Sequence, residues 1–94
     1  YFSEGPMISP ALAQWLAKKQ IAMLGLETPG VHPVEWEKVH KILLKAEIVI
    51  VEGLANLNKL KKEDIFFIAT PLKIKGRDGS PVRAVAIEDM ASYR

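Results

Sequence analysis

The stretch IAMLGLETPGVHPVEWEKVHKILLKAEIVIVEG, residues 21–53, decides the fold of this chain. It begins with a short apolar run, Ile21 to Leu26, and ends with a β-branched run, Ile48 to Val51. Both runs are too short for a helix and are typical of strands that are covered on both faces. Between them, Val34 to Ala46 has apolar residues at helical spacing with charged residues among them, which predicts an amphipathic helix. Strand, helix and strand in this order predict a βαβ unit with a right-handed crossover and parallel strands.

A further helix is predicted ahead of this unit. Ser9 suits the N-cap position and Pro10 the first helical position, and the apolar spacing continues to about Lys19. Trp15 in this helix and Trp36 in the next stand at helical spacing from apolar neighbours, so both are expected in the core.

The part of the chain after the βαβ unit is expected to be mostly strand. Leu54 to Leu60 contains leucines at a spacing that indicates one short helical turn. Residues 65–69 and 72–75 have the pattern of strand pieces interrupted by Pro71, and residues 82–87 that of a last strand after a turn rich in glycine. The fold class predicted for the whole chain is therefore α/β.

Composition narrows the function classes. With 94 residues, 49% of them apolar and 26% charged, the chain is expected to be globular, with one core at most. Thirteen basic and eleven acidic residues give a net charge of +2, which does not indicate a nucleic-acid partner. No apolar run is long enough for a membrane span, and the first six residues lack the pattern of a signal peptide, so no membrane partner is expected.

The chain contains no cysteine, which excludes disulfides, thiolate zinc sites and cysteine nucleophiles and leaves His, Asp and Glu as the strong metal ligands. A reducing compartment follows as the expectation, and the predicted location is cytoplasmic. The sequence begins with Tyr1 and almost at once reaches its first helix signal, so we expect it to be the later part of a longer polypeptide.

Two residues are the main candidates for chemistry. Glu52 stands at the carboxyl end of the second apolar strand, where open parallel sheets bind ligands. From the residues alone, the favoured alternative is that it marks the point where the strand reaches water or caps the following turn at Leu54 to Leu57. His40 lies on or beside the apolar face of the helix between Trp36 and Leu43, as a core histidine or as a ligand. Counted back from the turn near Glu47, His40 lies roughly 10 Å up the helix and Glu52 roughly 15 Å up the strand, so the two could share a site. An imidazole and a carboxylate suit zinc, manganese or iron(II), but two ligands do not complete a site.

Two other candidates concern substrate binding. His32 lies in a loop of glycine and proline residues and is expected to be solvent-exposed, with substrate binding as the alternative role. Arg83 follows the turn Asp78 to Pro81 and could bind a substrate carboxylate or pair with a nearby acid. The sequence contains no phosphate-binding glycine loop that opens a helix and no serine nucleophile elbow.

Four segments in order carry a family resemblance: Val39 to Leu44, Ile48 to Leu57, Ile68 to Ile74 and Asp78 to Val85. Together they resemble the carboxyl-terminal half of the cyclase-like metal-dependent hydrolases, which include bacterial kynurenine formamidases and isatin hydrolases. The resemblance implies a swivelling β/β/α-type domain, of which residues 1–94 would be only the C-terminal part, with the βαβ unit and the later strands. It also implies homodimers or larger homo-oligomers.

The resemblance implies roles for His40 and Glu52 as metal ligands, because the family has a helix His and a Glu twelve positions later. The other ligands and the proton-handling histidine belong to an amino-terminal motif, His-x-Gly-Thr-His-x-Asp, which does not occur in this chain. No catalytic residue is therefore assigned here, and the N-terminal part of the same protein is an expected partner. The implied activity is hydrolysis of a small-molecule amide or cyclic amide with zinc or manganese.

One loop departs from the family. Relatives often have Gly-x-Asp-x-x-Ser-x-Asp after the first strand, where this chain has Gly25-Leu26-Glu27-Thr28-Pro29-Gly30-Val31-His32. The segment Gly53 to Leu60 also resembles the broader cyclase group more than dedicated kynurenine formamidases, so the resemblance implies no particular substrate. The alternative function is a non-catalytic α/β binding or assembly module, in which His40 is a core residue.

Overall fold

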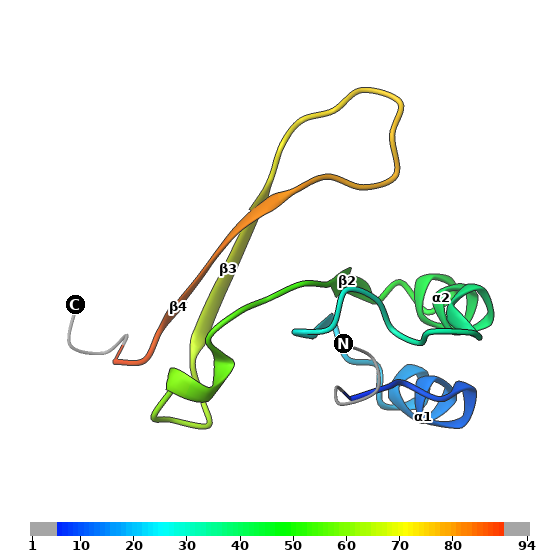
Figure 1. The fold of residues 1–94 in the computed structure, drawn as a ribbon, viewed down its shortest axis with the longest axis horizontal. Helices are drawn as coiled ribbons and strands as arrows, with labels where there is room; N and C mark the ends of the chain where they lie inside the picture. The colour runs from blue at the N-terminus through cyan, green and yellow to red at the C-terminus, as the bar shows by residue number, and fades with distance from the viewer. Residues whose placement is uncertain (1–5, 90–94) are drawn as a thin grey trace. The chain divides into compact units, whose positions relative to one another are not determined.

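The computed structural model describes residues 6–89 and divides into two compact units (Figure 1). The first unit runs up to Ala55 and the second begins at Asn56.

The first unit contains the predicted βαβ arrangement. Its elements are the helices α1 (Pro10–Lys19) and α2 (Trp36–Lys45) and the strands β1 (Met23–Gly25) and β2 (Val49–Val51). The two strands pair in parallel, with the register Met23↔Val49, Leu24↔Ile50 and Gly25↔Val51. The two helices pack against each other, as Figure 1 shows. The parallel pairing across α2 confirms the sequence prediction.

The start of α1 follows from its first two residues. The Ser9 hydroxyl oxygen accepts a hydrogen bond from the Leu12 N–H at 3.1 Å, and Pro10 occupies the first helical turn. The helix ends after Lys19, where Gln20 takes a left-handed conformation with φ 57°. The predicted N-cap and bounds of this helix are confirmed.

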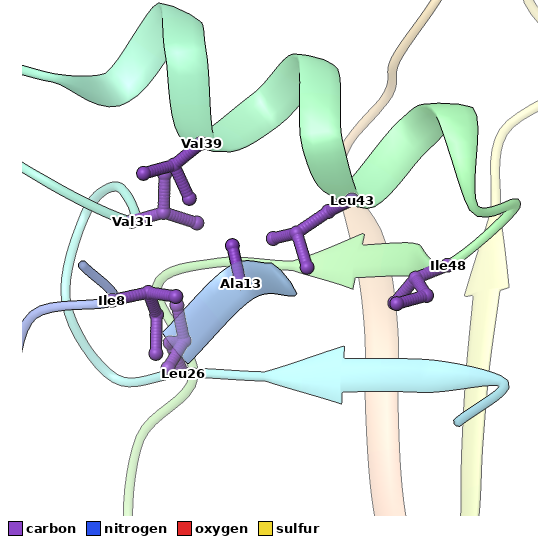
Figure 2. Close-up of a cluster of buried hydrophobic side chains, with 7 residues drawn as sticks. All are labelled: Ile8, Ala13, Leu26, Val31, Val39, Leu43 and Ile48. Atoms are coloured by element: carbon purple, nitrogen blue, oxygen red, sulfur yellow. The ribbon is translucent and has the colours of Figure 1, made fainter. Parts of the chain in front are cut away.

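The core of this unit lies between the two helices and one face of the sheet. Figure 2 shows Val39 and Leu43, one turn apart on α2, directed toward Ala13 of α1. All three are fully buried. The complete cluster of buried apolar residues is Ile8, Ala13, Leu26, Val31, Val39, Leu43 and Ile48. Burial of each larger side chain contributes about 1.5–3 kcal/mol, so this cluster is what holds α2 to the strands.

Two predictions about burial are wrong. Trp15 is 55% exposed and Trp36 52% exposed, so neither belongs to the core. Helical spacing identifies a general face, but both indoles stand on the flank of that face, beyond the width that the neighbouring elements cover. The strands are also not completely covered on both faces, since Met23 is 39% and Val49 52% exposed. Val51, on the same face of β2 as Val49, is buried at 6% exposure, so the cover on that face is partial.

The second unit is built on an antiparallel hairpin. Strand β3 (Phe66–Pro71) pairs with β4 (Val82–Ile87), in a register that runs from Phe66↔Ile87 to Pro71↔Val82, and a short 3-10 turn, η1 (Leu57–Lys59), precedes them. The bounds of β4 are as predicted. Residues 72–75 were expected to be strand, and this is wrong. Pro71 ends the ladder, and the Leu72 N–H donates to the Ser80 hydroxyl oxygen at 3.1 Å instead of to a partner strand.

Charged groups tie the end of the hairpin to the segment before it. The Lys61 N–H donates to a Glu88 carboxylate oxygen at 2.8 Å, and the Lys62 ammonium donates to the Asp89 carboxylate. The hydrogen bond that Lys62 donates to the Asp89 carboxylate raises the pKa of Lys62 above its usual value. In neither unit do the described residues form a helix with the length and apolar character that crossing a bilayer requires.

Candidate metal centre

The structure brings His40 and Glu52 together. Nε2 of His40 lies 3.2 Å from Oε2 of Glu52, and each side chain is 31% exposed. His40 is on α2, and Glu52 is the first residue after β2. The sequence estimate that both stand at similar heights above the helix–strand turn therefore agrees with the structure.

The connection between α2 and β2 sets the height of His40. The Ile48 N–H donates to the Leu43 carbonyl at 3.0 Å, and Glu47 has a left-handed φ of 61° that reverses the chain. Leu43 and Val39, the residue before His40, are both fully buried. His40 therefore directly follows a residue, Val39, that is held in the core. Its own side chain lies at the edge of the core, where the imidazole remains accessible to solvent.

Backbone hydrogen bonds on the carboxyl side of Glu52 fix its position. The Gly53 N–H donates to the Thr28 carbonyl and the Leu54 N–H to the Leu26 carbonyl, each at 2.9 Å. Gly53 has a φ of 70°, a conformation that a side chain would disfavour. The chain therefore turns sharply just after Glu52 and is held against the loop that follows β1.

That loop is itself ordered from within. Thr28 is fully buried, and its hydroxyl donates to the Gly30 carbonyl at 2.7 Å. This loop is the one that departs from the family pattern. Its internal hydrogen bond, donated by Thr28, could not be inferred from residue spacing alone. The exposed Glu52 carboxylate is thus supported by a loop with a buried polar anchor.

Trp36 contacts the imidazole of His40. Their ring centroids are 6.1 Å apart at an interplanar angle of 73°, an edge-to-face arrangement. Trp36 and His40 are four residues apart on α2 and so lie on the same side of the helix. The half-exposed indole, wrongly predicted to be core, therefore limits the orientations open to His40.

The pair is spaced as two ligands of one metal ion would be. Two ligand atoms at about 2.0–2.1 Å from a tetrahedral ion lie about 3.3 Å apart, close to the observed 3.2 Å. Without an ion, the same distance is a hydrogen bond in which Nε2–H donates to the carboxylate. Within residues 6–89, no group of three or more His, Asp or Glu side chains could hold an ion. The described residues thus fit part of a metal site.

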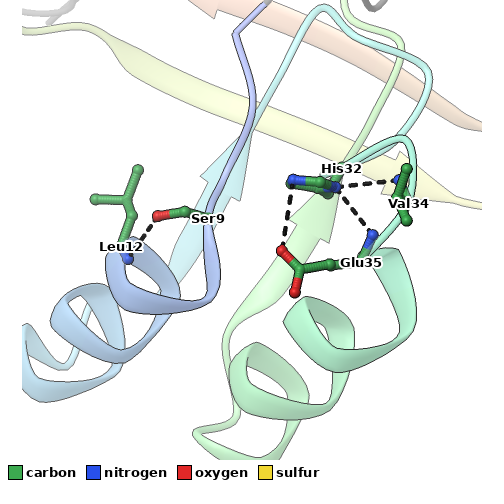
Figure 3. Close-up of polar contacts among 5 residues, drawn as sticks. All are labelled: Ser9, Leu12, His32, Val34 and Glu35. Atoms are coloured by element: carbon green, nitrogen blue, oxygen red, sulfur yellow. Dashed lines mark hydrogen bonds and ion pairs between the residues drawn. The ribbon is translucent and has the colours of Figure 1, made fainter.

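His32 has a different environment from the one predicted. Its side chain is only 17% exposed, so the expected solvent exposure is wrong. Figure 3 shows that Nδ1 accepts from the N–H groups of Val34 at 3.1 Å and Glu35 at 2.9 Å, while Nε2 lies 3.8 Å from a Glu35 carboxylate oxygen. The imidazole satisfies the backbone ahead of α2. A proline directly after it, as Pro33 is, was the available sequence signal for this role.

Arg83 lies on β4 opposite Thr70, and the Thr70 hydroxyl donates to the Arg83 carbonyl at 3.4 Å. It belongs to the second unit. Its role in substrate binding, like that of His32, stays a prediction.

Comparison with solved structures gives the class of protein. One similar solved structure is described as that of a potential metal-dependent hydrolase with cyclase activity. It matches this chain with a TM-score of 0.71 and 33% identity, and the match covers 85% of this chain and 40% of the other. It is also similar to a predicted metal-dependent hydrolase from Bacillus stearothermophilus, with a TM-score of 0.72, 32% identity, and coverage of 87% and 40%. The chain is thus similar in sequence and fold to proteins described as metal-dependent hydrolases, which confirms the resemblance found in its sequence.

Curated relatives give a more particular likeness. The chain is 32% identical over 82 residues to a kynurenine formamidase of Bordetella petrii, covering 85% of this chain and 39% of the relative. It is 37% identical over 83 residues to that of Polaromonas naphthalenivorans, covering 86% and 37%. It is also 37% identical over 81 residues to that of Geobacillus thermodenitrificans, covering 84% and 38%. The chain therefore spans just under two fifths of the length of these relatives. No protein-family model matches it.

Proposed function

We propose that the protein containing this chain hydrolyses a small amide or cyclic amide with a divalent metal ion, zinc or manganese, and that His40 and Glu52 are two of the ligands. The 3.2 Å contact between Nε2 of His40 and Oε2 of Glu52 carries this proposal. The similarity to kynurenine formamidases and metal-dependent hydrolases supports it.

The residues of this chain would hold and orient the ion. A divalent ion would supply a water of lowered pKa and polarise the scissile carbonyl. Nε2 of His40 and the Glu52 carboxylate would bind it, while the edge-to-face contact with Trp36 limits the orientation of the imidazole. Because the chain has no cysteine, its share of the site is nitrogen and oxygen only, a ligand set that both zinc and manganese accept.

The remaining ligands and the group that moves the proton would come from the N-terminal part of the same protein. The complete domain would then be of the swivelling β/β/α type, with residues 1–94 as its C-terminal portion, and homodimers or larger homo-oligomers are expected. A formamide such as that of kynurenine is the first substrate to test, because formamidases are among the relatives.

Substitution of Glu52 tests the proposal. In the full-length protein, Glu52→Gln removes a negative ligand and should weaken zinc binding by more than the roughly 10–100-fold that loss of an outer-shell partner costs. The matched control is Glu37→Gln, which makes the same chemical change at an exposed position of α2. Metal content after dialysis and hydrolysis of the kynurenine formamide are the measurements. Full metal occupancy and normal turnover in Glu52→Gln would exclude the assignment.

The non-catalytic module makes a different prediction about the same protein, because it should purify without stoichiometric zinc or manganese. Its premise that His40 is a core residue disagrees with the structure, where the imidazole is 31% exposed beside a carboxylate.

A further inference from the structure

We infer that His32 is a positioning residue for α2, and through α2 for His40, acting as a neutral imidazole whose Nδ1 caps the backbone at the helix entrance. The part of this inference that concerns His40 rests on the proposed metal site. The capping itself does not depend on any metal.

The His32 side chain holds the backbone just ahead of α2, whose N-cap residue is Glu35. Nδ1 accepts from the N–H groups two and three residues further on, Val34 at 3.1 Å and Glu35 at 2.9 Å. These are the amides to which Ser, Thr, Asp and Asn side chains bond when they cap a helix. Pro33, which has no N–H, stands between the acceptor and these amides, so it presents no donor that would compete for the ring nitrogen.

These hydrogen bonds determine the form of the ring. A nitrogen that accepts two N–H groups carries no hydrogen, so the proton of the neutral imidazole is on Nε2. Nε2 faces the Glu35 carboxylate at 3.8 Å, an environment that favours a hydrogen on that nitrogen. With the side chain only 17% exposed, little water is available to replace the ring as acceptor.

Two hydrogen bonds, joined through the Glu35 backbone, connect His32 with the residue before His40. Nδ1 of His32 holds the Glu35 N–H, and the Glu35 carbonyl accepts from the Val39 N–H at 3.0 Å. Val39 is fully buried and immediately precedes His40. The Glu35 side chain makes no capping hydrogen bond at the start of α2, so the bond from its N–H to the imidazole is what fixes this N-cap residue. Loss of the acceptor should loosen the first turn of the helix that presents His40.

The test compares two replacements that separate capping from packing. His32→Asp keeps an acceptor but loses ring volume, whereas His32→Leu keeps apolar volume but loses the acceptor. In the metal-free full chain, amide hydrogen exchange at Val34 and Glu35 should accelerate by about 2- to 30-fold in His32→Leu, the range that follows from loss of an N-cap, and much less in His32→Asp. In the unsubstituted chain, ¹⁵N NMR of the His32 ring should show Nδ1 without a proton and Nε2 with one.

The opposite order of the two variants, with Leu protected and Asp not, would overturn the capping role, as would a protonated Nδ1 in the unsubstituted chain. If His32→Leu does not fold, the ring tautomer and the exchange rates of His32→Asp still decide the question. Zinc affinity, measured by competition with a chromophoric chelator, tests the effect on His40. It should fall at least about threefold in His32→Leu and return in His32→Asp, and equal affinities would overturn the positioning role. Failure of the metal site itself is seen separately, as zinc binding that Glu52→Gln leaves unchanged.

Discussion

His40 and Glu52 are twelve residues apart in the chain, yet Nε2 of His40 lies 3.2 Å from Oε2 of Glu52. The two atoms are close because α2 and β2 extend from one tight turn and place the two residues at similar heights above it. Both side chains remain accessible, at 31% exposure each. The pair therefore stands outside the cluster of buried residues that stabilises the unit, and binding at this pair can be separated experimentally from folding.

This separation gives the first prediction. In the metal-free chain, Glu52→Gln should change the free energy of unfolding by less than about 1 kcal/mol, since accessible ion pairs contribute little. Urea unfolding followed by circular dichroism measures the change, with Glu37→Gln as the control for loss of one carboxylate on the same unit. A loss of several kcal/mol in Glu52→Gln alone would show that the pair is structural.

The second prediction concerns the turn that follows Glu52. Gly53→Ala places a side chain on a residue with φ 70°, which should cost about 1–2 kcal/mol even though nothing lies within 4 Å of the added Cβ. Gly53→Asn should cost less, because asparagine tolerates this conformation better. Thermal unfolding and zinc affinity are the measurements, and both should worsen in Gly53→Ala.

Gly79→Ala is the control for this effect, because Gly79 also has open space around its Cβ position but no left-handed φ. Equal losses at the two glycines would mean that backbone strain at Gly53 is not what holds Glu52 in place.

Local signals in the sequence were sufficient for several elements. Ser9 and Pro10 determine the start of α1 through one side-chain hydrogen bond and one fixed dihedral angle, so no tertiary information is needed. The proximity of His40 and Glu52 was also predictable, because helical and strand rises are nearly constant and a single turn joins the two elements. Their role as metal ligands came only from the family resemblance and stays a prediction.

Other features depend on what surrounds a residue. Periodicity assigns Trp15 and Trp36 to a helix face, but only packing determines how much of that face is covered. Leu72 has strand propensity, yet its amide is bound by the Ser80 hydroxyl. The cap formed by His32 depends on which ring nitrogen carries the proton, a choice that no residue pattern specifies.

The third prediction tests the core of the first unit. Leu43→Ala should destabilise the chain by about 2–5 kcal/mol, since Leu43 is fully buried and a cavity would remain between α2 and the strands. The control is the next residue, Leu44→Ala, which removes the same atoms at 58% exposure and should change stability by about 0.5 kcal/mol or less. Urea unfolding of both variants measures the difference. Similar values would contradict the assignment of Leu43 to the core.

The fourth prediction concerns the loop that holds Gly53. Thr28→Val keeps the shape of a fully buried side chain but removes the hydroxyl that donates to the Gly30 carbonyl at 2.7 Å. The unpaired carbonyl should cost about 1–3 kcal/mol. Thr70→Val is the control, because its hydroxyl is exposed and donates over 3.4 Å, and its substitution should be nearly neutral. Thermal unfolding distinguishes the two, and a neutral Thr28→Val would mean that the loop does not need this bond.

The fifth prediction uses the indoles as reporters of the proposed site. Trp36 contacts the His40 ring at 6.1 Å between centroids, whereas the Trp15 ring is covered by the Lys19 ammonium at 5.3 Å. In the full-length protein, manganese bound at His40 and Glu52 should therefore quench Trp36 more strongly than Trp15. Most of the manganese-dependent quenching should therefore disappear in Trp36→Phe, whereas it should remain in Trp15→Phe. Adding Glu52→Gln should abolish it, since the ion would no longer be held beside His40. Quenching carried equally by both indoles would argue that manganese binds elsewhere and would remove this support for the proposed metal centre.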